Sequence, residues 1–256
     1  MPRDGSRKQV ICARWGTKFP AEDVNRLYRM VRRSVSGQLD FWCMTDDNRH
    51  LLESIRCLPL PVVPIVGHRL DHGWRKLGLF APDLGGPVGP TLYLDLDVAI
   101  TDSLDPLFDL AGEFLIIRDY RPLRFRNHHT GNSSVFRYNA GDFADLFPAI
   151  ENLGAEIERR YRNEQEFLSD FVLKRGTFQY WPDDWCVSYK HHCVRPLPQG
   201  LWSDPVLPPG VRVIVFHGRP KPEDAVLGIG SKWYRPLRPA AWLSNYLDGP
   251  GPADPR

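Results

Sequence analysis

The residues best suited to chemistry lie in the stretch from Thr91 to Pro106. Asp95 and Asp97 are two positions apart in a segment that alternates as a strand does, so both carboxylates are predicted to leave one face. Such a pair is costly inside a sheet but tolerable at a strand end, where a cation neutralises it. Carboxylate oxygens suit Mg²⁺ or Mn²⁺ shared with substrate phosphates. The alternative is that both aspartates are turn or cap residues.

Composition bounds the class of protein. The 256 residues, with a formal net charge of +2, are typical of a soluble globular protein and give no electrostatic basis for binding nucleic acid. The first residues lack a signal-peptide pattern, and no apolar run is long enough to span a membrane. Five cysteines without CxxC spacing indicate reduced thiols, and we expect a cytoplasmic protein. The cluster Cys186, His191, His192 and Cys193 fits no common zinc-site spacing.

Strand and helix signals alternate along the chain. Before the aspartates, strands are predicted at Lys8–Trp15, Phe41–Thr45 and Val62–Val66, with helices after Pro20 and over His72–Phe80. After them, the predicted elements are strands at Glu113–Asp119, Ser134–Tyr138, Thr177–Trp181 and Val211–Phe216, two helical stretches within Phe143–Lys174 that break around Arg162-Asn163, and a closing helix at Ala240–Leu247. This alternation predicts an α/β fold with a mostly parallel central sheet flanked by helices, whose ligands lie at the carboxyl ends of the strands. We expect one domain over residues 1–248 and a disordered tail at 249–256.

Four motifs, in order, resemble those of GT-A-fold glycosyltransferases, especially retaining family-8-like enzymes of the glycogenin and lipopolysaccharide-galactosyltransferase type. Asp95-Leu96-Asp97 is similar to their DxD signature, and Asn132-Ser133-Ser134-Val135 to their Asn-Ser-Gly-Val. Glu164-Gln165-Glu166 resembles Asp-Gln-Asp, with both acids lengthened. His217 to Pro222 resembles His-x-x-Gly-x-x-Lys-Pro-Trp, but the histidine directly precedes the glycine and the tryptophan is absent. The resemblance implies a single Rossmann-like GT-A domain.

The resemblance also implies roles around a sugar nucleotide. Asp97, Asp95 and His217 would bind Mn²⁺ or Mg²⁺, Asp95 alternatively binding the donor ribose. Gly218 would let the backbone approach the diphosphate, and Lys221 would place a charge on it. The alternatives are a strand-end histidine and an ordinary Pro-rich turn.

The nucleotide is expected at the exit of the first strand. The stretch from Ala13 to Lys18 resembles the base and ribose loop of the family. Its expected nucleotide-binding residues are Ala13, Trp15, Gly16 and Thr17, although Trp15 could be simple core. Asp46 is expected to hydrogen-bond the base or ribose. Lys76 is expected to neutralise phosphate or to be an exposed helical lysine.

Asn132, Ser133 and Gln165 fall where the family surrounds the donor sugar. Gln165 would face the anomeric carbon, and because an amide is a poor nucleophile, front-side displacement is favoured over a covalent intermediate. Glu164 and Glu166 are expected to orient sugar hydroxyls or to be helix-surface residues, with at least one of them facing solvent.

Two basic segments have open interpretations. The helix after Pro20 carries four arginines that are either a solvated face or a contact with the inner face of a membrane, namely Arg26, Arg29, Arg32 and Arg33. A later loop is also basic and is interpreted either as a site for an acceptor phosphate or as a solvated lid. Its basic residues are Arg121, Arg124, Arg126, His128 and His129.

These features favour a metal-dependent transferase that moves a sugar from a nucleotide-diphosphate sugar, with UDP as the expected nucleotide, to a glycan, lipid-linked or small acceptor. A sugar nucleotidyltransferase would need a glycine-rich phosphate loop after the first strand, and Arg14 to Lys18 is a poor version of one. The further alternative is a non-catalytic relative that binds a nucleotide sugar or a protein partner.

Overall fold

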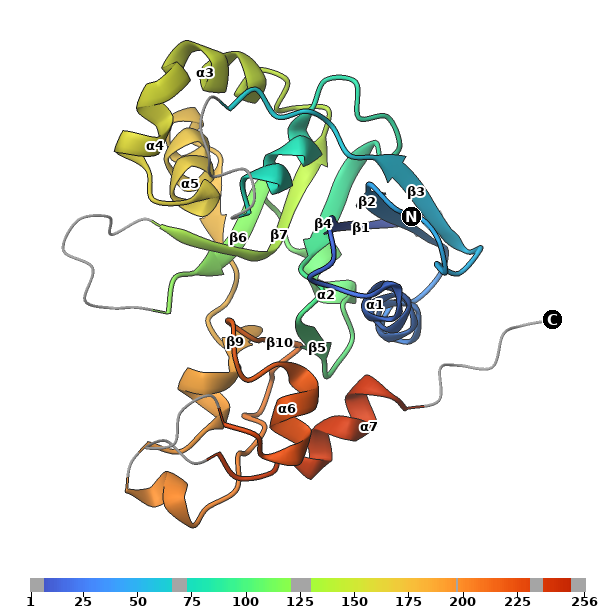
Figure 1. Ribbon diagram of the computed structural model, residues 1–256, viewed down its shortest axis with the longest axis vertical. Coiled ribbons are helices and arrows are strands. Elements are labelled where there is room, and N and C mark those ends of the chain that lie inside the picture. The colour runs from blue at the N-terminus through green and yellow to red at the C-terminus, as the bar shows by residue number, and fades with distance from the viewer. Residues whose placement is uncertain (1–6, 66–72, 121–129, 197, 231–236, 250–256) are drawn as a thin grey trace.

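The computed structural model describes residues 7–65, 73–120, 130–196, 198–230 and 237–249 and has the predicted α/β architecture (Figure 1). Its main sheet has seven strands in the order β3-β2-β1-β4-β7-β6-β8, and a second sheet has three, in the order β5-β10-β9. In the main sheet only β7 runs against its neighbours, so the sheet is mostly parallel, as predicted.

The main-sheet strands are β1 (Lys8–Arg14), β2 (Leu39–Thr45), β3 (Ile55–Pro59), β4 (Gly89–Leu94), β6 (Phe114–Arg118), β7 (Gly131–Ala140) and β8 (Phe178–Tyr180). Those of the small sheet are β5 (Val98–Ile100), β9 (Cys186–Ser188) and β10 (Val213–Val215). The α-helices are α1 (Ala21–Ser34), α2 (Asp105–Asp109), α3 (Leu146–Leu153), α4 (Ile157–Arg160), α5 (Glu164–Arg175), α6 (Pro222–Leu227) and α7 (Ser244–Leu247). Tighter or wider helical turns are η1 (Trp74–Phe80), η2 (Gly154–Glu156), η3 (Tyr189–Cys193), η4 (Gln199–Leu201) and η5 (Ala241–Leu243).

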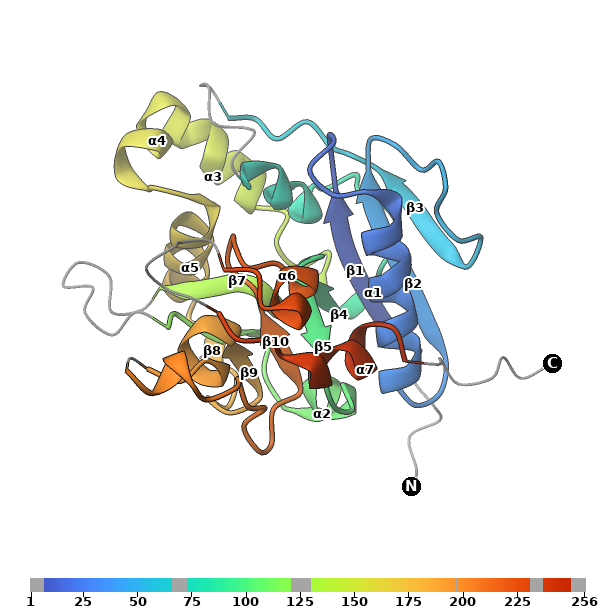
Figure 2. The same cartoon turned by 60° about the horizontal axis from the view of Figure 1, so that its bottom comes forward.

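Alternating apolar residues give the main sheet two buried faces. In β4, Leu92 and Leu94 enter one core with α1, α7 and the small sheet, and Tyr93 enters the other. That second core contains η1, α3 and α5. Figures 1 and 2 show these two layers, with α1, α6 and α7 on one side of the sheet and α3 to α5 on the other. The predicted alternation continues beyond the strand, because Leu96 and Val98 lie in the same core as Leu92.

The small sheet positions the segment after β4. β5 pairs antiparallel with β10, with Val98 opposite Val215, and the Phe216 amide donates to the Asp97 carbonyl at 3.1 Å. On the other side, the Asp95 amide donates to the Ser134 carbonyl at 2.9 Å. The two aspartates are therefore held between β7 and β10, at the junction of the two sheets.

The prediction of a strand at Val62–Val66 is wrong. The third strand is β3, which ends at Pro59, and Val62 is 89% exposed. Pro61 and Pro64 lack the N–H groups that a strand ladder needs, which explains why this segment does not join the sheet. Val66 and the beginning of the predicted helix at His72 lie outside the described residues, and η1 begins at Trp74.

Candidate active site

A pocket of about 490 Å³ lies at the carboxyl ends of β1 and β4. Ala13 and Trp15 line it from the end of β1, and Asp95 and Asp97 from the segment after β4. The remaining lining residues come from the loop after β1, from the η1 region and from β4 itself, and are Lys18, Phe19, Gly73, Lys76, Tyr93 and Leu96. The predicted aspartate pair therefore faces a pocket at the predicted edge of the sheet.

Asp95 is fixed by two buried partners. The Tyr93 hydroxyl donates to its Oδ1 at 2.7 Å, and the Lys76 ammonium lies 2.8 Å from the same atom. Lys76 is only 6% exposed, so it is not an exposed helical lysine. Asp95 is thus oriented by the chain itself.

Lys76 connects three of the predicted site residues. Its ammonium donates to the Ser133 carbonyl at 3.1 Å and lies 3.8 Å from Glu164 Oε1, to which the Ser133 hydroxyl donates at 3.0 Å. Burial by itself lowers the pKa of Lys76, but Asp95 and Glu164 outweigh it, so the pKa lies above its ordinary value. The ammonium therefore remains charged and offsets part of the negative charge of the site.

Asp97 lies in an environment that disfavours its charge. Burial, followed by repulsion from Asp95, raises its pKa to about 7, although Lys18 and Lys76 act in the opposite direction. A carboxyl group in this condition gains from any further positive charge placed beside it.

His217 directly follows Phe216, the residue whose amide binds the Asp97 carbonyl. The buried Nε2 of His217 has no hydrogen-bond partner among the described residues. Burial, together with the Lys190 charge, lowers the pKa of His217 to about 4, and Asp95 only partly opposes this. The imidazole is therefore neutral near pH 7, as a metal ligand must be.

These side chains fit a divalent cation chemically. An unpartnered imidazole nitrogen and two carboxylates form a mixed donor set that Mn²⁺ accepts. Within the part of the chain that the structure describes, no three His, Cys, Asp or Glu side chains are close enough together to form a preassembled metal site. This also holds for the Cys186–Cys193 cluster, in which burial raises the pKa of both thiols.

The loop after β1 includes the predicted nucleotide residues. Trp15 is half-buried and packs against the core beneath the pocket, while Gly16 and Thr17 are exposed. Gly16 has a positive φ of 59°, and its amide donates to Asp46 Oδ2 at 3.1 Å. Asp46 therefore braces this loop from the end of β2.

The N-terminus of α5 faces the same site. The Asn163 side chain caps it by accepting from the Glu166 amide at 3.1 Å. Gln165 is half-buried, and its carbonyl accepts from Ser169 at 2.6 Å. Within the motif Glu164-Gln165-Glu166, Glu164 is linked to the pocket through Lys76.

The prediction that Glu164 or Glu166 faces solvent is wrong, because they are only 8% and 4% exposed. Glu164 turns inward to Ser133 and Lys76. Glu166 folds back over the helix start, where it accepts from the Arg162 amide at 2.9 Å and pairs with the Arg162 guanidinium. Reciprocal capping thus buries a glutamate that helix periodicity alone would expose.

Two further predicted residues have internal partners or a special backbone. Asn132 is buried, and its Oδ1 accepts from the Ser134 amide at 2.9 Å. Gly218 has a φ of 67°, and a Cβ added there would meet no atom within 4 Å. Glycine is therefore favoured at position 218 because of the backbone conformation, and not because a larger side chain would lack space.

Sequence reasoning missed Phe19, Tyr93 and Gly73 as site residues, and it placed Lys18 in the nucleotide loop without giving it a role of its own. Tyr93 shares the strand face of Asp95, so period-two alternation contained the signal. Gly73 has a φ of 97°, and a Cβ there would lie 2.8 Å from Glu164 Oε2. This close approach depends on tertiary packing and leaves no local pattern.

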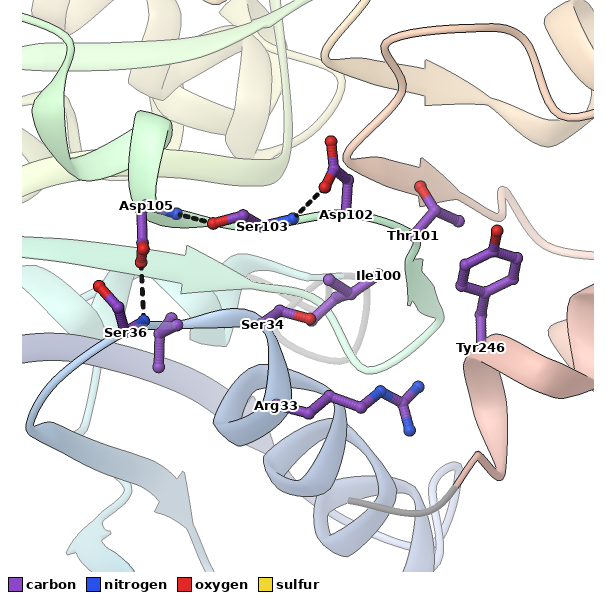
Figure 3. Close-up of a pocket in the computed structure, with 10 residues that line it drawn as sticks. Arg33, Ser34, Ser36, Ile100, Thr101, Asp102, Ser103, Asp105 and Tyr246 are labelled. Carbon is purple, nitrogen blue, oxygen red and sulfur yellow. Dashed lines mark hydrogen bonds between the residues drawn. The ribbon is translucent and has the colours of Figure 1, made fainter. Parts of the chain in front are cut away.

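A second pocket, of about 460 Å³, lies at the other end of β1 between the end of α1, the segment after β5 and α7 (Figure 3). Its Asp105 accepts from the Ser36 amide at 3.0 Å and pairs with Lys8, and its Asp102 lies 3.3 Å from Arg212. Because these carboxylates are already engaged, this pocket fits a structural junction better than a catalytic site.

The two basic segments have different outcomes. On α1, Arg26 pairs with Asp23 and Glu223, and Arg29 pairs with Glu22. Two of the four predicted surface arginines thus have their charge balanced by acidic side chains. The loop with Arg121, Arg124, Arg126, His128 and His129, like residues 250–256 of the predicted tail, lies outside the described residues. None of the described helices has the length and apolar character needed to cross a bilayer.

The architecture is that of the GT-A glycosyltransferases, as the motifs predicted, and the similar solved structures are enzymes of that class. The galactosyltransferase LgtC, crystallised with donor and acceptor sugar analogs, aligns with 84% of this chain and 88% of its own at 17% identity and a TM-score of 0.57. The glycosyltransferase GlyE of Streptococcus pneumoniae TIGR4 aligns over 93% of this chain and 60% of its own, at 15% identity and a TM-score of 0.59. Mouse xyloside xylosyltransferase 1 aligns over 84% and 98%, at 13% identity and a TM-score of 0.50. No protein-family profile and no curated protein sequence matches the chain.

Proposed function

We propose that this protein is a metal-dependent glycosyltransferase that moves a sugar from a nucleotide-diphosphate sugar, with UDP as the expected nucleotide, to a glycan, lipid-linked or small acceptor. The observation that carries the proposal is the pocket at the carboxyl ends of β1 and β4, which Asp95 and Asp97 line. The residue before His217 binds the Asp97 backbone, and the buried Nε2 of His217 has no hydrogen-bond partner among the described residues. This arrangement occurs in a chain whose fold matches glycosyltransferases. The free cysteines suit a cytoplasmic enzyme, or one bound peripherally at the inner face of the membrane.

In this proposal Asp95, Asp97 and His217 hold Mn²⁺ or Mg²⁺. When bound, the cation supplies Lewis-acid stabilisation of the charge that develops on the leaving diphosphate. Asp95 is already oriented by Tyr93 and Lys76, so little reorganisation is needed on binding. Ala13, Trp15, Gly16 and Thr17 bind the nucleoside, with Asp46 bracing their loop, and Gly218 and Lys221 approach the diphosphate.

The donor sugar lies between the β7 start and the α5 start, beside Asn132, Ser133, Glu164 and Gln165. Transfer breaks the bond between the anomeric carbon and the diphosphate oxygen and forms one to the acceptor oxygen. The acceptor proton passes to the leaving diphosphate. Gln165 supports the positive charge that develops at the anomeric carbon, and retention of configuration follows from front-side attack. Lys76 holds Glu164 and Ser133 in place for this step.

The test is a thermal-shift titration with nucleotides and nucleotide sugars, with and without Mn²⁺. A ligand at about 100 times its Kd stabilises the fold by roughly 2.7 kcal/mol. We expect a Mn²⁺-dependent shift with UDP or a UDP-sugar that is lost in Asp97→Ala and kept in the exposed control Asp83→Ala.

Each other outcome has a definite meaning. Retained Mn²⁺ affinity in Asp97→Ala would contradict the metal site. Mn²⁺-dependent binding without sugar transfer to any acceptor would favour the non-catalytic binder. The absence of a shift with any nucleotide would contradict the proposed function.

A further inference from the structure

The ring of Phe19 carries two ammonium groups from opposite ends of the chain. Lys18 Nζ lies 4.9 Å from its centroid, and Lys221 Nζ lies 4.8 Å from the same centroid. Lys221 immediately precedes α6, whereas Lys18 and Phe19 belong to the loop between β1 and α1. The tertiary structure thus places two positive charges around one ring, and Lys18 and Phe19 line the candidate donor pocket.

The Phe19 backbone is held by contacts with the end of β1, and its side chain packs against the core. Arg14, at the end of β1, donates from Nε to the Phe19 carbonyl at 3.0 Å and from Nη1 to the Asp47 carbonyl at 2.5 Å. Pro20 then leads directly into α1. These contacts hold the Phe19 backbone in place, and the attraction of its ring for cations restrains two otherwise flexible lysine side chains.

Both ammonium groups are available for a ligand. Neither lysine makes an ion pair with a carboxylate in the stretches of chain that the structure describes. Lys76, the other pocket lysine, is by contrast fully engaged by Asp95, Ser133 and Glu164. Two like charges held around one ring repel each other, and a polyanion bound to them relieves that repulsion.

We propose that Lys18 is a second diphosphate-binding residue, which acts with Lys221 as a pair held on the Phe19 ring and takes the diphosphate of a nucleoside diphosphate. This inference rests on the proposed function, because the diphosphate is that of the donor. Asp95 and Asp97 line the pocket, and its buried lysine, Lys76, is already engaged by Asp95 and Glu164, so an incoming diphosphate needs positive charge from another residue. Lys18 supplies it from the side of the pocket nearest the nucleoside loop.

The experiment is calorimetric titration of UDP, UMP and uridine, each with Mn²⁺, into the full chain and its variants. Lys18→Ala is expected to raise the Kd for UDP about tenfold, corresponding to the loss of one charge-assisted contact, and to raise that for UMP less. The Kd for uridine is expected to remain unchanged. Lys18→Arg keeps the charge and is expected to retain most of the affinity for UDP.

Two further variants test the role of the Phe19 ring and provide a control for the loss of a lysine. Phe19→Leu leaves both lysines present but removes their support, and a partial loss of UDP affinity is expected. Lys174→Ala, an exposed lysine of α5 paired with Asp170, is the matched control and is expected to bind like the unmodified chain. The salt dependence of UDP binding is expected to weaken in Lys18→Ala but not in the control.

Equal loss of UDP and uridine affinity in Lys18→Ala would overturn the inference, since Lys18 would then shape the loop. No loss at all would also overturn it. If the unmodified chain binds UDP and Asp97→Ala abolishes that binding, the proposed function stands whatever Lys18 does. If the unmodified chain binds none of the three ligands, both proposals fail.

Discussion

At the scale of single residues, the candidate site has more carboxylates than internal cations to balance them. Lys76 offsets Asp95 and Glu164, but Asp97 keeps a pKa of about 7 because burial and Asp95 both oppose its ionisation. The neutral imidazole of His217 adds a donor but no charge. In the ligand-free protein such a site therefore has an unfavourable electrostatic free energy, which a bound cation removes.

This cost predicts a pH dependence for the metal-free protein. The pKa of Asp97 is higher in the folded than in the unfolded chain, so between about pH 4 and 7 the folded state holds a proton that the unfolded state has lost. The contribution of Asp97 to the free energy of unfolding therefore falls as the pH rises through this window. Asp97→Asn is expected to stabilise the protein on the order of 2 kcal/mol at pH 8, less than the full pKa shift implies because the carboxylate keeps some contact with water.

Urea unfolding in the presence of a chelator measures this effect at pH 4.5 and pH 8. The gain is expected to be small at pH 4.5, where Asp97 is largely protonated in the folded protein. Asp83→Asn, at an exposed position, is expected to show no such difference. A gain of equal size at both pH values would show that the pKa of Asp97 is not raised.

At the scale of elements, the start of α5 does two things with four consecutive residues. Asn163 and Glu166 cap the helix, while Glu164 turns inward to Ser133. The cap therefore positions the candidate sugar-binding residue Glu164 as well as stabilising the helix.

Asn163→Ala removes the side chain that accepts from the Glu166 amide, and the expected loss is about 1 kcal/mol in the free energy of unfolding. Asn163→Asp keeps an acceptor oxygen at this position and is expected to lose little. Urea unfolding of the two variants provides the comparison. If both lose equally, the cap is not the source of the stability.

At the scale of the whole molecule, the candidate site is assembled from both ends of the chain. Residues 13–19 form the end of β1 and the loop after it, and residues 217–221 follow β10, in the other sheet. Lys221 over the Phe19 ring and the ion pair between Arg26 and Glu223 join these regions. A ligand bound to both segments should therefore couple the two sheets.

Hydrogen exchange provides a test of that coupling. With Mn²⁺ and UDP bound, amide exchange is expected to slow together in residues 15–19 and 217–221. Residues 100–105, in the pocket of Figure 3, are expected to exchange at an unchanged rate. Protection confined to one of the first two segments would contradict a shared site.

Local sequence patterns determined much of the framework. The alternation around Leu92 to Val98 correctly predicted two buried faces and the placement of Asp95 and Asp97 at the pocket edge, because period two is a property of the backbone. The break near Asn163 was likewise readable from helix chemistry. The third strand was misplaced because the apolar residues around Val62 outweighed the missing N–H groups of the neighbouring prolines.

Only the tertiary structure decided which of these residues meet. The β5–β10 pairing brings Phe216, the residue before His217, to the Asp97 backbone. Burial turns Lys76 and Glu164 into partners, and the segment before α6 brings Lys221 to Phe19. Each of these contacts joins segments far apart in the chain, and its energy depends on the low polarity of the folded interior. A sequence pattern records the chemistry of each group, but the charge balance of the site exists only once the chain has folded around it.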